Sequence, residues 1–352
     1  MNHLQTYLAE EFVEDYQEGR ISRRQALKRL ASLTGSVMLA QSFLAACALP
    51  PEATATAPPA ATQPPATQPA ASATPSAAPA ASATGIAASA TPAATGSQAA
   101  PANTQFAAGT GAAPAGTVTA DDPAVFAEAV EFPGEDGATV QGYLAYPSNE
   151  GTYPVVLVCH ENRGLTAHIQ DVTRRFAKAG YAALAVDLLS RQGGSGAVGE
   201  SGAAGALGGN SPEQMVGDFR SGWNWLNDKA FADTARVGMV GFCFGGGITW
   251  QVATQVPELK AAVPFYGPPP AESAVPNIQA AVLAVYGGRD TRITSTQPAI
   301  EAAMQANGKT YSKLIYTDAD HAFFNDTGTR YNDAAAHDAW AQVLAWFGEY
   351  LV

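Results

Sequence analysis

The most constraining stretch of the sequence is a short apolar strand that runs directly into a glycine-rich turn and a helix. The strand pattern covers residues 237–240, the turn reads Gly-Phe-Cys-Phe-Gly, and a helix is expected from Gly246. The glycines that flank Cys243 allow strand and helix to approach closely, because they have no Cβ. A helix N-terminus beside a cysteine favours its thiolate and offers free N–H groups to an oxyanion. The stretch predicts a cysteine nucleophile on a sharp turn; the alternative is an inert, buried cysteine.

The segments around this turn alternate between strand and helix patterns, with an antiparallel hairpin first. A glycine-rich loop is expected at 188–210. This alternation predicts an α/β fold with a mainly parallel, doubly wound sheet and an N-terminal antiparallel hairpin. Ligand sites in such sheets lie at the carboxyl ends of strands. Strands are expected at 125–132, 139–146, 153–159, 181–186, 236–240, 261–266, 281–286 and 311–316, and helices at 167–179, 211–229, 246–254, 297–307 and 331–350.

Composition divides the chain into three parts. Residues 53–120 contain no charged side chain and are dominated by Ala, Thr, Pro, Ser and Gly. Such a segment cannot bury enough apolar surface to offset its ordering entropy, so we expect a disordered linker at 48–117 and a catalytic domain at 118–352. The net charge of −12, with no basic patch beyond the N-terminus, argues against nucleic-acid binding.

Residues 1–47 resemble an export signal. Arg23 and Arg24 precede an apolar run, 30–44, that is too short to span a bilayer, as in twin-arginine signals. The run ends in Leu-Ala-Ala-Cys47, which resembles a lipobox, whose cysteine is lipidated. We therefore expect a protein exported to the outer face of the bacterial cytoplasmic membrane and held there by a lipid anchor. The alternatives are an ordinary signal peptide and a buried N-terminal helix.

A cysteine nucleophile needs a base and an acid that orients it. Asp290 follows a predicted strand, and His321 follows the last one, in the order nucleophile, acid, histidine. Asp318 and Asp320 are rival acids, but they are too near His321 in sequence to approach its far nitrogen easily. His337, the other histidine after the turn, lies in a helix pattern and is expected to face solvent.

Four motifs resemble the dienelactone hydrolase (carboxymethylenebutenolidase) family of α/β-hydrolases. They are His-Glu-Asn-Arg-Gly at 160–164, Gly-Phe-Cys-Phe-Gly-Gly at 241–246, Tyr-Gly-Gly-Arg-Asp at 286–290 and His-Ala-Phe-Phe-Asn-Asp at 321–326. The resemblance implies a triad of Cys243, Asp290 and His321. It also implies that Glu161 contacts the resting thiol, and that the backbone N–H groups of Asn162 and Phe244 form the oxyanion hole.

The resemblance also bears on the substrate. Two arginines hold the substrate carboxylate in this family, and Arg191 stands at one of those positions. Asn325 stands at the other, where it lacks the charge and the bidentate geometry of arginine. Arg330 is a possible replacement, although a surface position is favoured for it. Tyr266 either lines the pocket or packs in the core.

The remaining chemistry-bearing residues give weaker signals. Cys159 is expected to fill the core, with a disulfide to Cys243 as the alternative. No Cys/His spacing fits a metal site, and no glycine motif fits a dinucleotide or phosphate loop, so no metal or cofactor is expected.

The sequence thus predicts a membrane-tethered, monomeric hydrolase that opens small-molecule esters or lactones through an acyl-enzyme on Cys243. Three alternatives stay open. They are a divergent hydrolase or lyase on other small carbonyl compounds, a non-catalytic surface-anchored binding domain, and a redox thiol protein with a resolving cysteine near Cys243.

Overall fold

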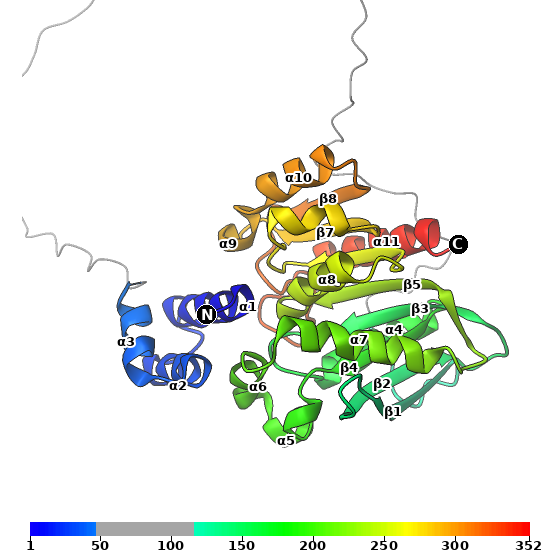
Figure 1. Cartoon of the computed structure of the whole chain (residues 1–352), viewed down its shortest axis with the longest axis horizontal. Coiled ribbons are helices and arrows are strands. Elements are labelled where there is room, and N and C mark those ends of the chain that lie inside the picture. The colour runs from blue at the N-terminus through cyan, green and yellow to red at the C-terminus, as the bar shows by residue number, and fades with distance from the viewer. Residues whose placement is uncertain (47–115) are drawn as a thin grey trace, which may run out of the picture. The chain divides into compact units, whose positions relative to one another are not determined.

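The computed structural model describes residues 1–46 and 116–352. Its core is one eight-stranded sheet with the order β1-β2-β4-β3-β5-β6-β7-β8 (Figure 1). Strands β3 to β8 are parallel, and β1 and β2 form the antiparallel hairpin. This confirms the predicted fold class. The strands are β1 (Val125–Pro133), β2 (Thr139–Pro147), β3 (Tyr153–Cys159), β4 (Ala182–Asp187), β5 (Ala232–Phe242), β6 (Ala261–Phe265), β7 (Ala281–Gly287) and β8 (Tyr311–Tyr316).

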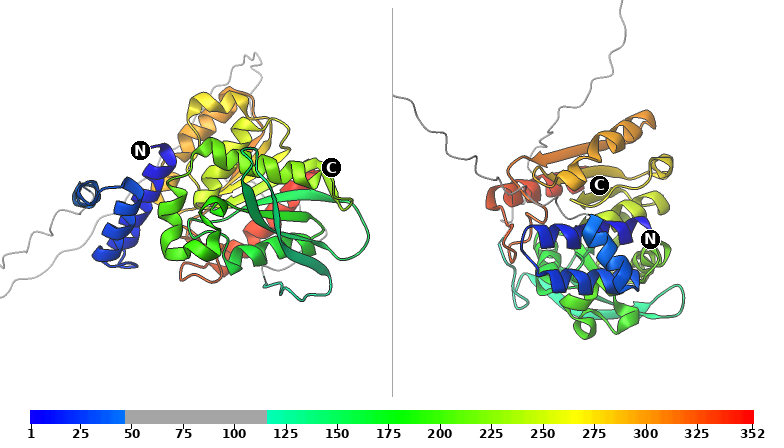
Figure 2. Two further views of the ribbon diagram at one scale, coloured as in Figure 1. Left: turned by 60° about the horizontal axis from the view of Figure 1, so that its bottom comes forward. Right: turned by 90° about the vertical axis from the view of Figure 1, so that its left-hand side faces the viewer.

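Helices cover both faces of this sheet (Figure 2). One face carries α4 and α11, whose rings Phe176 and Trp340 lie 4.6 Å apart. The other carries α7 and α8, which contact each other and β5. Because the central strands are buried on both faces, they are almost wholly apolar, as predicted. The helices after β3 are α4 (Ala167–Lys178), α5 (Ser195–Val198), α6 (Glu200–Leu207), α7 (Pro212–Leu226), α8 (Phe244–Gln255), α9 (Thr291–Thr294), α10 (Gln297–Ala306) and α11 (Asp333–Tyr350), with 3-10 turns η1 (Ser190–Gln192) and η2 (Glu272–Asn277).

One local prediction was wrong. The segment 188–210, expected as a loop, contains η1, α5 and α6. Its small residues hide the helical pattern, yet Ala203 and Leu207 are buried on one side of α6. The helix after the sharp turn begins at Phe244, close to the expected start near Gly246, and Cys243 itself is its N-cap. This places the cysteine directly at the helix N-terminus.

The N-terminal segment forms α1 (His3–Gln17), α2 (Arg23–Thr34) and α3 (Val37–Ala46). The described residues on both sides of the gap belong to one compact unit. Helix α1 contacts α8, and α2 contacts α6. No helix among residues 1–46 and 116–352 is long and apolar enough to cross a membrane. Cys47 and nearly all of the expected linker, 48–117, lie outside the described residues.

Candidate active site

Cys243 stands at the end of β5 in a strained backbone conformation. Its φ is 58° and its ψ is −119°, a region that side chains with a Cβ rarely adopt. The turn is tight enough to require glycine on both sides. A Cβ at Gly241 would lie 2.2 Å from the carbonyl oxygen of Gly245, and one at Gly245 would lie 2.5 Å from that of His160. Strand and helix therefore hold the thiol at the carboxyl edge of the sheet.

Backbone strain in the described residues gathers around this cysteine. Three residues other than glycine have positive φ angles there: Cys243 (58°), Tyr266 (36°) and Ala322 (60°). The Tyr266 ring lies 4.9 Å from the ring of His321, and Ala322 follows that histidine directly. Strained residues often cluster at active sites, so this clustering marks the same place that the motifs predicted.

An acid and a histidine accompany the cysteine. The Nδ1 atom of His321 lies 2.6 Å from Oδ2 of Asp290, and both side chains are almost fully buried. The histidine follows β8 and the aspartate follows β7. Of the rival acids, Asp318 is exposed and Asp320 is partly buried, and both lie near Arg289. The geometry thus pairs the histidine with Asp290 rather than with either rival.

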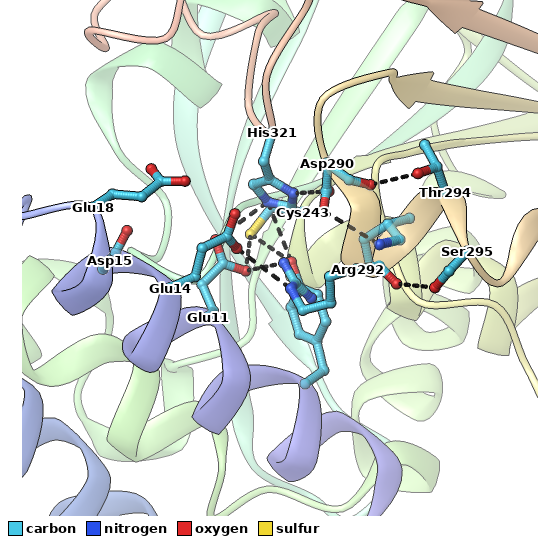
Figure 3. A network of polar contacts seen from close by, with 12 residues as sticks. Glu11, Glu14, Asp15, Glu18, Cys243, Asp290, Arg292, Thr294, Ser295 and His321 are labelled. Carbon is cyan, nitrogen blue, oxygen red and sulfur yellow. Dashed lines mark hydrogen bonds and ion pairs between the residues drawn. The ribbon is translucent and has the colours of Figure 1, made fainter. Parts of the chain in front are cut away.

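Two side chains from α1 enter this site, and sequence reasoning missed both. The Tyr7 hydroxyl lies 3.1 Å from Sγ of Cys243 and 3.3 Å from Nε2 of His321. The carboxylate of Glu11 lies 3.6 Å from the same sulfur and 3.3 Å from the same nitrogen (Figure 3). The available signals were the asparagine N-cap of α1 and its apolar face, neither of which names a partner more than 230 residues away.

Arg292 contacts both Tyr7 and Glu11. Its guanidinium lies 3.4 Å from Glu11 and 3.4 Å from Glu14, and it stacks 4.5 Å from the Tyr7 ring. Burial would raise the pKa of Glu11, but the charges of His321 and Arg292 outweigh burial and lower that pKa to about 2. Glu11 is therefore ionised throughout the neutral range.

The buried charges set the protonation states of the reacting pair. Burial and the nearby Glu11 charge raise the pKa of Cys243, which favours the neutral thiol. Burial would lower the pKa of His321, but the carboxylates of Glu11 and Asp290 outweigh burial and raise it well above its usual value. With α1 in place, a carboxylate lies at each ring nitrogen of His321, and both carboxylates favour the imidazolium form.

The same atoms could in principle bind a metal ion. Ligand atoms of Glu11, Cys243 and His321 lie within 4.8 Å of one another, the one such group found among the described residues. Zinc accepts sulfur, nitrogen and oxygen ligands of this kind. The ion pairs described above, of Glu11 with Arg292 and of His321 with Asp290, already account for this cluster.

Comparison with known proteins identifies the family. The model of the dienelactone hydrolase family matches residues 140–351. The chain belongs to the dienelactone hydrolase family. A "Putative carboxymethylenebutenolidase" of Methylorubrum extorquens is 35% identical over 247 residues, 66% of this chain and 84% of that protein. Its counterpart in Escherichia coli (strain K12) is 32% identical over 249 residues, 66% of this chain and 90% of that protein.

A solved structure agrees with this assignment. The crystal structure of a "Putative Dienelactone Hydrolase" from Klebsiella pneumoniae is 32% identical, with a TM-score of 0.59, and is matched over 64% of this chain and 100% of that one. This member of the dienelactone hydrolase family therefore has an α/β-hydrolase fold. Since the family match begins at residue 140, helices α1 to α3 lie outside it.

Of the three groups that the resemblance implies at the thiol, Glu161 has a different partner from the expected one. Glu161 does not supply the carboxylate nearest the sulfur, which is that of Glu11. Instead, Glu161 accepts a 2.7 Å hydrogen bond from the amide of Asn325. Asn162 lines the same cavity as Cys243, and Phe244 opens α8, where its N–H has no partner within the helix.

Arg191 does not face the site, contrary to the sequence prediction. Its guanidinium donates to Asp136 on the hairpin turn, at 2.8 and 3.0 Å, and to Asp218 of α7, at 2.6 Å. These two carboxylates accept the hydrogen bonds of the Arg191 guanidinium, which lies in the loop after β4. Arg330, for which a surface position was favoured, instead lines the cavity beside Cys243. The burial of Arg330 would lower its pKa, but the nearby Glu11 and other acids outweigh this and raise it.

The cavity beside the thiol has a volume of about 280 Å³. Polar and charged side chains from both the hydrolase core and the N-terminal helices line it, including Glu161, Asn162, Asn325, Arg330, Asp15 and Arg20. Phe12 of α1 is also part of its wall. The site is therefore a polar cavity that α1 narrows at the thiol.

The other predicted residues have structural positions. Cys159 and Cys243 are both free, so they do not form the alternative disulfide. Cys159 is fully buried at the end of β3, as expected for a core residue. The ring of His337 is exposed, and its Nδ1 lies 2.9 Å from the backbone carbonyl oxygen of Asp333.

Proposed function

We propose that this dienelactone hydrolase family member opens carboxylic esters or lactones through an acyl-enzyme on Cys243. The observation that carries the proposal is the 2.6 Å contact of Asp290 with Nδ1 of His321, which leaves Nε2 on the side of the thiol. The Tyr7 hydroxyl lies within 3.3 Å of both Sγ and Nε2, so those two atoms face one small space. This is the arrangement that a nucleophile and its general base require.

Acylation needs the neutral form of His321. Its Nε2 takes the thiol proton, and the thiolate attacks the carbonyl carbon of the substrate. The resulting oxyanion is stabilised by the backbone N–H groups of Phe244, at the start of α8, and Asn162. Collapse of the tetrahedral intermediate breaks the carbon–oxygen bond, and the imidazolium gives its proton to the leaving alkoxide. In a lactone the new hydroxyl stays attached to the acyl group.

Deacylation reverses these roles. The neutral imidazole of His321 takes a proton from water, and the hydroxide attacks the thioester carbonyl. The carbon–sulfur bond breaks, the carboxylic acid leaves, and the proton returns to the sulfur of Cys243. Asp290 keeps Nδ1 protonated and the ring oriented throughout, because its carboxylate accepts the Nδ1–H bond.

The choice of substrate rests on the charges around the cavity. Arg191, the family position for a carboxylate contact, is held by Asp136 and Asp218. Arg292 and Arg330 are the guanidinium groups close to Glu11, a carboxylate that already lies at the thiol. We therefore propose small-molecule substrates, with Arg292 and Arg330 as the groups available to an acyl chain that carries a negative charge.

The export prediction supplies the proposed location. Arg23 and Arg24 are exposed at the start of α2, where an export machinery could bind them. We propose a lipid-anchored monomer on the outer face of the cytoplasmic membrane, with Cys47 as the lipidated residue. Export followed by proteolysis would then separate α1 to α3 from the hydrolase.

Substitution of the nucleophile tests the proposed function. We expect Cys243→Ala to abolish hydrolysis of a panel of esters, lactones and carboxylate-bearing lactones, measured as kcat/KM. The matched control is Cys159→Ala, which removes the other buried thiol of the described chain and should keep most of the activity. Full activity in Cys243→Ala would show that another group attacks the carbonyl.

A further inference from the structure

We propose that segment 1–46 is an autoinhibitory element: helix α1 closes the active site of the folded chain, and the enzyme becomes active when this segment is displaced or cleaved away. The inference rests on the proposed function only in taking Cys243 and His321 as the reacting groups. It concerns residues outside the part of the chain that matches the family.

The first argument is steric. The hydroxyl of Tyr7 and the carboxylate of Glu11 occupy the space in front of both reacting atoms, within 3.6 Å of Sγ and 3.3 Å of Nε2. A substrate carbonyl must come within about 3.5 Å of the sulfur to react. Cys243 is only 3% exposed and His321 only 2% exposed. Although Cys243 borders the cavity of about 280 Å³, these two side chains lie against its sulfur and obstruct the approach of a substrate.

The second argument is electrostatic. Glu11 pairs with the imidazolium form of His321, in which Nε2 already carries a proton and cannot take one from the thiol. The groups that face this histidine are Glu11 and Tyr7 from α1, and Cys243, Tyr266 and Asp290 from the core. Departure of α1 removes one of the two carboxylates that favour the charged ring. The same movement therefore opens the site and restores the base.

The third argument is that α1 is docked by specific contacts. Leu4 and Leu8 are almost fully buried on the face that carries Tyr7 and Glu11. Leu4 packs at Gly247 of α8, where its Cδ2 lies 3.1 Å from the position of a Cβ. The Gln5 amide donates to the Gly208 carbonyl at 2.7 Å. A single helix of this length is marginal in water, so these contacts hold it in place.

A different role for α1 is to complete the substrate pocket as a permanent wall. The family model matches residues 140–351, so the matched part of the chain has its nucleophile, acid and histidine without α1. Moreover, a wall residue should leave the reacting atoms free, whereas Tyr7 and Glu11 contact both of them. These observations favour closure, and the two roles predict opposite effects when α1 is released.

The test releases α1 in the full chain. Leu4→Asp/Leu8→Asp places two carboxylates in the docking face, while the control Glu10→Arg changes the charge of an exposed residue of the same helix. Two readouts are measured: the rate of Cys243 alkylation by iodoacetamide, followed by peptide mass spectrometry, and kcat/KM for an uncharged ester. We expect both to rise at least tenfold in the double variant and to stay at the wild-type value in Glu10→Arg.

Three other outcomes distinguish closure of the site from the proposed ester function. Unchanged or slower alkylation overturns the proposal, because the thiol was then already accessible. Faster alkylation with slower hydrolysis also overturns it and assigns α1 to the catalytic pocket. If alkylation is faster but no chain hydrolyses the ester, wild type included, closure of the site by α1 is supported. The proposed ester hydrolysis is then contradicted instead. The two proposals can thus fail separately.

A second measurement tests the proposal without the double variant, which could misfold. A site-specific protease sequence is inserted between residues 60 and 100, and the chain is cut after it has folded. Dilution should then release segment 1–46 and raise the alkylation rate of Cys243. A synthetic peptide of residues 2–21 should slow it again, whereas the same peptide with Tyr7→Phe and Glu11→Gln should not. Equal alkylation before and after release would overturn the proposal.

Discussion

The sharp turn at Cys243 gives a prediction whose size can be worked from the structure. A Cβ at Gly241 would lie 2.2 Å from the Gly245 carbonyl oxygen and 2.4 Å from Oγ1 of Thr249. Oγ1 donates to that same carbonyl at 2.9 Å, so neither group moves freely. To reach van der Waals contact, α8 must move away from β5 by roughly 1 Å. We therefore expect Gly241→Ala to displace the nucleophile as well as to strain the fold.

Overpacking of this kind lowers the free energy of unfolding by up to about 3 kcal/mol. For a domain of this size, that loss lowers Tm by roughly 6–12 °C. A 1 Å displacement of the nucleophile lowers kcat by about a hundredfold. The control is Gly348→Ala in α11, whose new Cβ would have no neighbour within 4 Å. It should stabilise the helix by up to about 1 kcal/mol.

Thermal unfolding and steady-state hydrolysis measure both effects. The two alanine substitutions should shift Tm in opposite directions, and only Gly241→Ala should lose turnover. If Gly241→Ala unfolded within about 1 °C of the wild type and kept its kcat, the close approach of β5 and α8 would not constrain the site.

Three further predictions concern charged residues. Asp290→Asn should lower kcat by about 10²–10⁴-fold, because the amide no longer fixes the tautomer of His321; unchanged kcat would exclude Asp290 as the orienting acid. Arg191→Ala should lower Tm, since it leaves Asp218 buried without its partner, but should not change KM for anionic esters. A selective rise in KM for anionic esters would instead show that Arg191 binds the substrate. Glu11→Gln removes a charge that raises the pKa of His321, and the reaction needs the unprotonated ring. The acidic limb of the pH profile of kcat/KM should therefore move to lower pH; a limb that stays in place would contradict this electrostatic account.

Much of the fold could be predicted from the sequence, because its signals are local. Continuous apolar runs such as 153–159 predicted the buried parallel strands, and the Asp-Gly turn predicted the hairpin. The chain order of Cys243, Asp290 and His321 predicted residues that the structure brings to the same edge of the sheet. Each follows a parallel strand, and the ends of such strands meet at that edge.

The errors concern contacts that depend on distant residues. Arg191 occupies a family position, but its direction is set by Asp136 and Asp218, which lie 55 and 27 residues away. The pattern of α1 shows an amphipathic helix and an N-cap, yet nothing in it names the cysteine that Tyr7 and Glu11 contact. In α6, glycine and alanine obscured a helix that packing against α2 supports.

The central claim is that Cys243 carries the acyl group during turnover. The most direct measurement is the intact and peptide mass of the wild-type and Leu4→Asp/Leu8→Asp chains, quenched in acid during hydrolysis of an activated ester. The account predicts an added acyl mass on the peptide that contains Cys243, more of it in the double variant, and none in Cys243→Ala. Turnover of the ester with no acyl mass on that peptide would contradict it.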